Sequence, residues 1–258
     1  MYLSCLLIDV GDNPDRPRPG RLWLRNLYHV HQRLCMAFPS DSRKNDDELF
    51  LKPFKPEDFG NGQVHVPRRI ESGFLFRIDP ETGGRVVILV QSAVKPDWDY
   101  AFKNADYLLA APPELKQYEP CFTKGNKLRY RLVVNPTKRL SKNSRERDGK
   151  LVSERWIGKR IPVPAEQLFD WLDHRAENAG FSIDRESTIV QPGYMYVKKP
   201  DNNNGQRLRS VRYDGILTVT DPVRFHETII SGIGPGKAFG FGLLSVSPVI
   251  QTIPESTL

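Results

Sequence analysis

Hydrophobic residues lie in short segments along the first half of the chain. Some of these segments have the pattern of a buried strand and others have the spacing of a helix. Residues 2–10 are rich in Leu, Ile and Val, as expected of a strand that is buried on both faces. An apolar stripe at helical spacing follows and stops at Pro39, which cannot continue a helix. The predicted elements are a strand at 2–10, a helix at 22–38, hairpin strands at 73–78 and 85–92, a helix at 98–110 and a strand at 118–123.

The same order of elements returns in the second half. Its last helix has Asp221 in position to cap the N-terminus and Pro222 in the first turn, where proline is tolerated. The predicted elements are a strand at 128–135, a helix at 164–179, strands at 193–198 and 211–220, a helix at 221–233 and a strand at 243–250. Each half therefore has the order βαββαβ, a split βαβ unit.

A basic segment interrupts the second half after its first strand. Between Lys138 and Arg160 there are nine basic and three acidic residues, a net charge of +6 out of the chain's +7. A run of this kind, with Trp156 inside it, favours a polyanionic partner over a merely solvated loop, which is the alternative.

Other features limit the class of protein. Cys5, Cys35 and Cys121 are too scattered for a metal site, and their odd number suits reduced thiols in the cytoplasm. No signal peptide is recognisable at the N-terminus, and no apolar run is long enough to cross a bilayer, so no membrane partner is expected.

The most distinctive segment lies between the last predicted helix and strand. It is rich in glycine from Gly232 to Gly242, so its backbone can adopt positive φ and approach another group closely. A dinucleotide-binding loop runs from strand to helix, which is the reverse order. A Walker A loop needs a glycine where Ser231 stands and a Ser or Thr where Ala238 stands. Both nucleotide-binding interpretations therefore fail.

The first helix carries the residues best suited to catalysis. The five histidines are His29, His31, His65, His174 and His226. Tyr28 and His31 are three residues apart and share a helix face at the edge of the apolar stripe, whereas His29 points roughly the other way. A histidine at this edge either stands at the rim of a groove or is a core-margin residue bonded to a backbone carbonyl, and spacing alone favours the second interpretation.

The glycine-rich segment and its flanks resemble the C-terminal loop of the repeat-associated RNA-processing proteins of CRISPR systems. The helix segment Leu27–Leu34 is similar to the histidine helix of the CasE family of precursor CRISPR RNA endoribonucleases, type I-E. The strand beginning at Leu128 and the segment Tyr213–Asp221 resemble further elements of that family. The resemblance implies an α+β fold of two tandem ferredoxin-like domains. These are residues 1–124 with the active-site helix, and 127–258 with the basic insertion and the glycine-rich loop.

The resemblance also implies an activity. His31 and Tyr28 would be catalytic in a metal-independent cleavage of the stem-loop repeat, in which the RNA 2′-OH attacks the adjacent phosphate and leaves 2′,3′-cyclic phosphate and 5′-OH ends. No cofactor and no metal is expected. Family members often have a basic residue one turn after the histidine, where this chain has Met36, so Arg33 or Lys159 is a candidate replacement.

The implied partners are the CRISPR repeat stem-loop RNA and the other subunits of a type I CRISPR surveillance complex. The basic insertion and a second basic group would contact RNA phosphates, with backbone N–H groups of the glycine-rich loop beside them. The expected RNA-binding residues are Lys138, Arg139, Lys142, Arg145, Arg147, Lys159, Arg160, Arg207, Arg209 and Lys237, with Lys198, Lys199 and Arg212 near the second group. The loop glycines are Gly232, Gly234, Gly236, Gly240 and Gly242. The alternatives are a non-catalytic CRISPR RNA-binding subunit of the same fold, and an unrelated basic ferredoxin-like protein.

Overall fold

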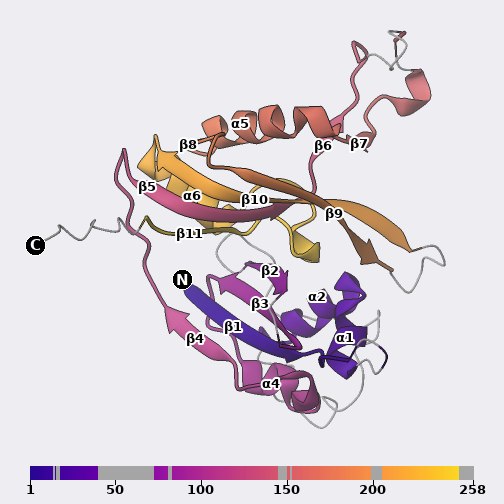
Figure 1. Ribbon diagram of the computed structural model, residues 1–258, viewed down its shortest axis with the longest axis vertical. Coiled ribbons are helices and arrows are strands. Elements are labelled where there is room, and N and C mark those ends of the chain that lie inside the picture. The colour runs from indigo at the N-terminus through magenta and orange to yellow at the C-terminus, as the bar shows by residue number, and fades with distance from the viewer. Residues whose placement is uncertain are drawn as a thin grey trace, which may run out of the picture.

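Two antiparallel sheets face each other in the protein, and helices cover their outer faces (Figure 1). The computed structural model describes residues 1–13, 15, 18–39, 73–80, 83–144, 150–151, 153–198 and 205–249. The expectations that concern His65, Arg145, Arg147 and Lys199 lie outside these residues. The protein is thus a mixed α/β protein with antiparallel sheets.

The first half is built around a sheet with the strand order β2-β3-β1-β4. The strands are β1 (Tyr2–Asp9), β2 (Phe74–Pro80), β3 (Arg85–Ser92) and β4 (Glu114–Gln117), and the helices are α1 (Pro19–Leu24), α2 (Leu27–Cys35), α4 (Trp98–Phe102) and the 3₁₀ turn η3 (Asp106–Leu108). Alternate residues of β1, including Leu6 and Ile8, are buried beneath the helices. The predicted hairpin is confirmed.

Three predictions for the first half were wrong in detail. The expected single helix over 22–38 is divided at Asn26, where the backbone is extended and the side chain caps α2. The expected strand at 118–123 is instead β4 at Glu114–Gln117, because β4 is the stretch that pairs with β1. Phe122 in the predicted stretch packs on Phe225, with ring centroids 4.7 Å apart. The predicted helix at 98–110 is reduced to α4 and η3.

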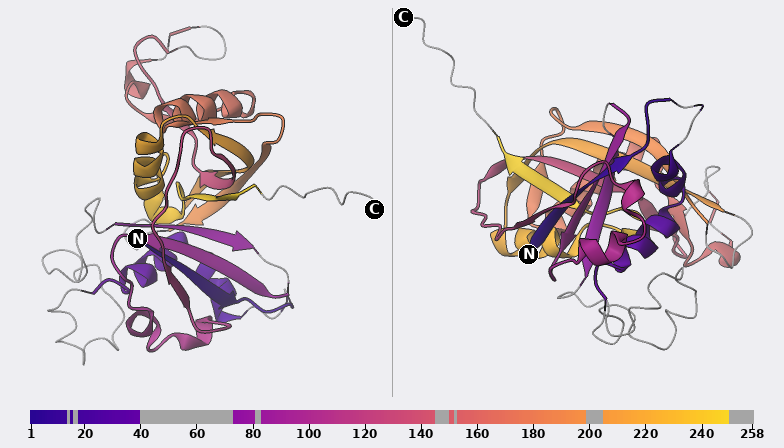
Figure 2. Two further views of the ribbon diagram at one scale, coloured as in Figure 1. Left: turned by 90° about the vertical axis from the view of Figure 1, so that its left-hand side faces the viewer. Right: turned by 90° about the horizontal axis from the view of Figure 1, so that it is seen from below.

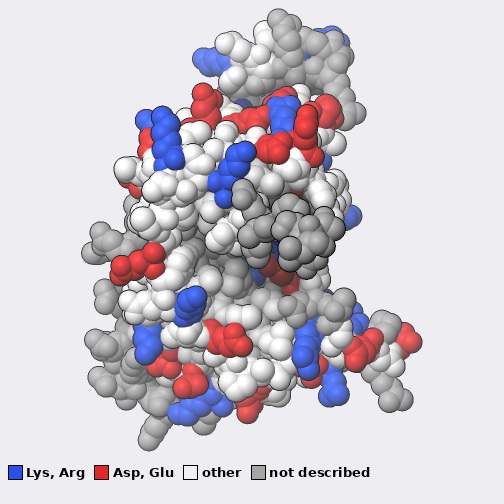
Figure 3. All heavy atoms as spheres, turned by 60° about the vertical axis from the view of Figure 1, so that its left-hand side comes forward, with Lys and Arg blue, Asp and Glu red and all other residues white. Residues whose placement is uncertain are grey.

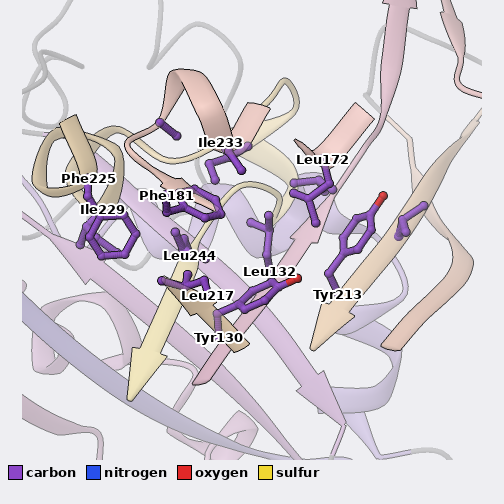
Figure 4. Packing of buried hydrophobic residues seen from close by; sticks show 14 of the residues in the cluster. Tyr130, Leu132, Leu172, Phe181, Tyr213, Leu217, Phe225, Ile229, Ile233 and Leu244 are labelled. Carbon is purple, nitrogen blue, oxygen red and sulfur yellow. The ribbon is translucent and has the colours of Figure 1, made fainter. Parts of the chain in front are cut away.

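The second half has a sheet with the order β11-β5-β10-β8, and β9 also pairs with the long β10. Its elements are β5 (Lys127–Val134), α5 (Leu168–Asn178), β8 (Phe181–Ile183), β9 (Ile189–Val197), β10 (Gln206–Val219), α6 (Pro222–Ser231), the 3₁₀ turn η6 (Lys237–Phe239) and β11 (Leu244–Pro248). Asp221 caps α6 as expected, accepting from the N–H groups of Val223 and Arg224. Figure 4 shows Leu132, Leu172, Phe181 and Phe225 filling the core between this sheet and its helices.

The basic insertion forms a separate small ribbon. Its strands are β6 (Thr137–Arg139) and β7 (Arg160–Pro162), which pair antiparallel, with the 3₁₀ turns η4 (Glu154–Trp156) and η5 (Ala165–Gln167) beside them. The ribbon projects beyond α5, away from the first half (Figures 1 and 2). The basic residues of β6 and β7 therefore lie on a protrusion and not on the faces of the two main sheets.

Polar side chains join the facing sheets. Arg77 is almost fully buried and pairs with Asp79, and its Nη1 donates to Ser245 Oγ at 2.8 Å in the other half. Gln91 Nε2 donates to the backbone oxygen of Ile229 at 2.6 Å. Buried polar groups destabilise a fold unless they are hydrogen-bonded, so these bonds fix how the two halves meet. That arrangement matters for the histidine helix, which lies at their junction.

Candidate active site

The histidine helix α2 begins where Asn26 joins it to the second half of the chain. Asn26 Oδ1 accepts from the N–H of Tyr28 at 3.2 Å, which caps the helix. The same side chain exchanges two hydrogen bonds with the backbone of Lys198 beyond β9, with Nδ2 donating at 2.9 Å and Oδ1 accepting at 3.0 Å. A carboxamide can do this because it carries a donor and an acceptor side by side. Lys198 is therefore held beside the start of α2.

His31 is half-buried against two phenylalanines of the edge strand β2. Its ring stacks on Phe74 with centroids 5.6 Å apart and on Phe76 with centroids 6.5 Å apart and an interplanar angle of 14°. One turn later on α2, the Sγ atom of Cys35 lies 3.6 Å from His31 Nε2. Three neighbours thus limit the orientation of the imidazole. A ring held in one plane is what proton transfer to a bound substrate requires.

The other side chains of α2 are arranged as the helical spacing predicted. Tyr28 is half-buried, like His31, whereas His29 is exposed and lies 3.3 Å from Asn26 through Nε2. Met36 is buried in the core of the first half, at the place where a basic residue was expected from the family pattern. His174 and His226 are exposed on helices of the second half.

The glycine-rich loop packs against α2 and β2. All five of its glycines have positive φ, between 72° and 91°. Its turn η6 contacts both α2 and β2. At Gly242 a Cβ would lie 2.6 Å from the carbonyl oxygen of Ile233, so this position requires glycine. The loop therefore lies against the helix that carries His31 and against its neighbouring strand.

Several N–H groups of the loop are already used within the protein. Those of Gly232, Ile233, Phe239 and Gly242 donate to backbone oxygens at 2.7–2.9 Å. The expected role of the loop glycines as a row of phosphate-binding N–H groups is therefore restricted to the remaining positions. Lys237, at the start of η6, is half-buried, and this burial lowers its pKa.

Three lysines and arginines are candidates for the cation missing at Met36. The Nη1 atom of Arg33 donates to the backbone oxygen of Ala101 at 2.9 Å, and burial lowers the pKa of the guanidinium. Lys159 is in the insertion, with its Nζ 4.6 Å from the ring centroid of Trp156. Lys237 belongs to the turn that contacts α2. Of the three, Lys237 is the one on a turn that packs against both α2 and β2.

Apart from Lys237, the expected RNA-binding residues that the structure describes divide between two neighbouring structures. Lys138, Arg139, Lys142, Lys159 and Arg160 are all exposed in the insertion. Arg207 and Arg209 lie on β10, paired with β9. The Nη1 atom of Arg209 donates to the backbone oxygen of Val163, which ties the β9–β10 hairpin to the base of the insertion. Arg212 forms an ion pair with Asp214, so it is less available for a ligand.

The sequence interpretation missed two aromatic residues on the β9–β10 hairpin. Tyr194 and Tyr196 are 65% and 45% exposed and lie on one face of β9. The guanidinium carbon of Arg207 lies 4.3 Å from the ring centroid of Tyr194. Two tyrosines at alternate positions of a strand, opposite arginines, were a readable signal for base stacking. The face of the molecule shown in Figure 3 differs from this basic and aromatic surface, because basic and acidic side chains are mixed on it.

Within the ranges that the structure describes, no group of three or more His, Cys, Asp or Glu side chains is arranged to hold a metal ion. Among the same residues, no helix is long and apolar enough to span a membrane.

The fold and the site define a two-sheet α/β protein with a histidine helix held at the junction of its halves. The family model of CRISPR associated proteins matches residues 1–248, and the chain belongs to this family. Over 198 residues it is 35% identical to CRISPR-associated endoribonuclease Cse3 of Thermus thermophilus, covering 71% of this chain and 85% of that protein. It is 29% identical over 251 residues to the Cascade subunit CasE of Escherichia coli, covering 96% and 100% of the two chains.

Solved structures of relatives share the fold. A structure of CRISPR endoribonuclease Cse3 bound to a 19-nucleotide RNA superposes with a TM-score of 0.67 at 28% identity, covering 96% of this chain and 100% of that one. A structure of Thermus thermophilus Cse3 with an RNA representing a pre-cleavage complex gives a TM-score of 0.65 at 27% identity, covering 96% and 98%. The predicted membership of the CasE family is confirmed.

Proposed function

We propose that this protein is an endoribonuclease that cleaves precursor CRISPR RNA within its stem-loop repeat and stays on the product as a subunit of a CRISPR surveillance complex in the cytoplasm. The observation that carries the proposal is the held imidazole of His31, in a chain of this family, at the junction of the two halves. The relatives named endoribonuclease and Cascade subunit support it.

Each half is proposed to be a ferredoxin-like domain, with bounds at 1–124 and 127–258. The sheet order β2-β3-β1-β4 supports this, because it places the first strand between the third and the last. In the second sheet, the first strand β5 likewise lies between β10 and the last strand β11, and both β8 and β9 pair with β10. The active-site helix then belongs to the first domain, and the insertion and the glycine-rich loop belong to the second.

The chemistry requires no bound group besides the RNA. The 2′-oxygen forms a bond to the adjacent phosphorus while its proton leaves, and the bond from phosphorus to the 5′-oxygen breaks while that oxygen gains a proton. The products are a 2′,3′-cyclic phosphate and a 5′-OH. His31 moves one of these protons, since an imidazole titrates near neutral pH, and Tyr28 orients the ribose or assists the transfer.

Lys237 is proposed to stabilise the charge that builds up on the phosphate. It takes the place of the basic residue that is Met36 in this chain, because its turn contacts α2. A half-buried ammonium interacts more strongly with an anion than a fully solvated one. Lys237 is thus assigned a role beside the scissile phosphate and not only in binding.

The stem of the repeat is proposed to lie on the surface formed by the insertion and the β9–β10 hairpin. The exposed basic residues there contact phosphates, which position a duplex without reading its sequence. Tyr194 and Tyr196 extend the surface with rings on which unpaired bases can stack. The bond from Arg209 to Val163 keeps the two parts of this surface together.

Incubation with repeat RNA in EDTA tests the proposed activity. Wild-type protein should cut the repeat once and leave a cyclic phosphate, whereas His31→Ala should bind the RNA and leave it whole. RNA with a 2′-deoxyribose before the cut should stay intact. A wild-type protein that binds the repeat but never cuts it would establish the alternative, a non-catalytic RNA-binding subunit. Equal cleavage by His31→Ala would show that another group does the chemistry.

A further inference from the structure

Phe76 contacts both the catalytic imidazole and the glycine-rich loop. Its ring is fully buried in the core of the first half. One side stacks on His31 at an interplanar angle of 14°. A Cβ placed on Gly240 would lie 3.0 Å from Phe76 Cε2, so the backbone of Gly240 rests against the same ring. These contacts form a continuous path from the loop of one half to the histidine of the other.

The loop encloses the edge strand β2 from both sides. At Gly232 a Cβ would lie 2.8 Å from Leu75 Cδ1, and at Gly240 it would meet Phe76. Consecutive side chains of a strand point to opposite faces of the sheet, so Leu75 and Phe76 mark its two faces. The loop therefore fixes β2 at the point from which Phe74 and Phe76 reach His31.

We infer that the glycine-rich loop positions the catalytic histidine, with Gly240 and Phe76 acting as positioning residues. The inference rests on the proposed function and deepens it. In this arrangement Gly240 lets the loop approach closely enough to hold the Phe76 ring, and that ring holds the plane of the His31 imidazole. The five glycines thus serve close packing around β2 and α2 in addition to any contact with RNA.

A single methyl group at Gly240 should disturb this arrangement. A contact of 3.0 Å is tighter than almost all real Cβ contacts, so the Phe76 ring must move by a few tenths of an ångström. A fully buried ring has no free space to move into, and displaces the imidazole stacked on it. Because proton transfer depends steeply on geometry, a shift of this kind is expected to slow cleavage by about 10–100-fold.

Gly240→Ala should therefore lower the single-turnover cleavage rate by about 10–100-fold while RNA affinity changes less than about 3-fold. The matched control is Gly83→Ala, at a similarly positive φ of 76° with nothing within 4 Å of the added Cβ. It carries the same backbone strain and should cleave like wild type. Nuclear magnetic resonance adds a direct readout, because the stacked Phe76 ring shifts the signals of the His31 ring protons, and only Gly240→Ala should change them.

A second variant tests the inference even if the Gly240→Ala protein fails to fold. Phe76→Leu keeps a buried aliphatic side chain but removes the stacked ring, and should also slow cleavage. Its matched control is Phe181→Leu, which changes an equally buried ring in the core of the second half. Both variants lose stability, but only Phe76→Leu should lower the rate per folded molecule.

The outcomes separate this inference from the proposed function. Slow cleavage by Gly240→Ala and Phe76→Leu, with both controls normal, supports it. If wild type cleaves and His31→Ala does not, but Gly240→Ala and Phe76→Leu cleave at the wild-type rate, the positioning role is wrong and the enzyme assignment stands. If wild type does not cleave the repeat at all, the proposed function fails first.

Discussion

Asn26 offers a direct test of how the active-site helix is held. One side chain makes the cap of α2 and both hydrogen bonds to the backbone of Lys198. Asn26→Ala removes all three bonds. Asn26→Ser keeps an oxygen that can cap the helix but is too short to replace the bonds to Lys198. The pair of variants therefore separates the local contribution from the one between the two halves.

The magnitudes follow from these contacts. Loss of an N-cap costs about 1 kcal/mol. The two bonds to Lys198 are partly open to solvent, so each is given the low value of about 0.5 kcal/mol. Asn26→Ala should then lose about 2 kcal/mol of unfolding free energy, and Asn26→Ser about 1 kcal/mol. For a chain of this size the expected drops in melting temperature are about 4–8 °C and about 2–4 °C.

Thermal melting followed by circular dichroism measures these differences, and a single-turnover cleavage assay accompanies it. Asn126→Ala is a matched control, because Asn126 Oδ1 accepts from the N–H of Thr123 in the segment between β4 and β5 and makes no contribution to the cap of α2. The control should melt slightly lower and cleave normally. If Asn26→Ser melts and cleaves like wild type, the bonds to Lys198 contribute nothing. If Asn26→Ala also melts and cleaves like wild type, Asn26 does not stabilise the start of α2.

Further predictions concern the chemistry and the RNA surface. His31→Ala should lose about 10²–10⁴-fold in cleavage rate with little change in affinity, whereas His29→Ala should be mild, since His29 is exposed on the other side of α2; gel-resolved single-turnover reactions compare them. Replacing Lys142 and Arg160 with Ala should weaken binding to every hairpin alike and flatten the plot of log K against log salt by up to about 0.9 for each lost phosphate contact; an unchanged slope would leave the insertion a solvated protrusion. Because burial lowers the pKa of Lys237, wild type should lose cleavage rate relative to Lys237→Arg as the pH becomes alkaline, since arginine keeps its charge; parallel pH profiles would exclude Lys237 from the charge-stabilising role.

Much of the fold was predictable because the period of the hydrophobic residues and the positions of the turn and capping residues indicated the same elements. The hairpin of β2 and β3 and the capped helix α6 are examples. The strand β4 was missed because all four of its residues are exposed, so it carries no hydrophobic signal. Its position depends on pairing with β1, which is a property of the whole sheet. The residues after it looked like a strand because they include the aromatic residues Tyr118 and Phe122, but Phe122 packs on Phe225 of the second half.

The site was predictable to the level of residue type and spacing. The placement of Tyr28 and His31 on one side of α2 followed from helical geometry. The stacking of His31 on Phe74 and Phe76 did not, because His31 lies more than forty positions before both phenylalanines in the sequence. The contact of Gly240 with Phe76 is more distant still. A single sequence contains no signal for such long-range contacts.

The loop that encloses β2 also sets the order in which the protein can become active during synthesis. The histidine helix leaves the ribosome before the residues that hold its neighbouring strand, Gly232 to Gly242. Until then β2 is an edge strand whose backbone can pair with other chains. Packing of the loop against Leu75 and Phe76 of β2 then completes the surroundings of His31. A nascent or truncated chain is therefore expected to contain its histidine without a working site, so RNA cutting begins only when the full recognition surface is also in place.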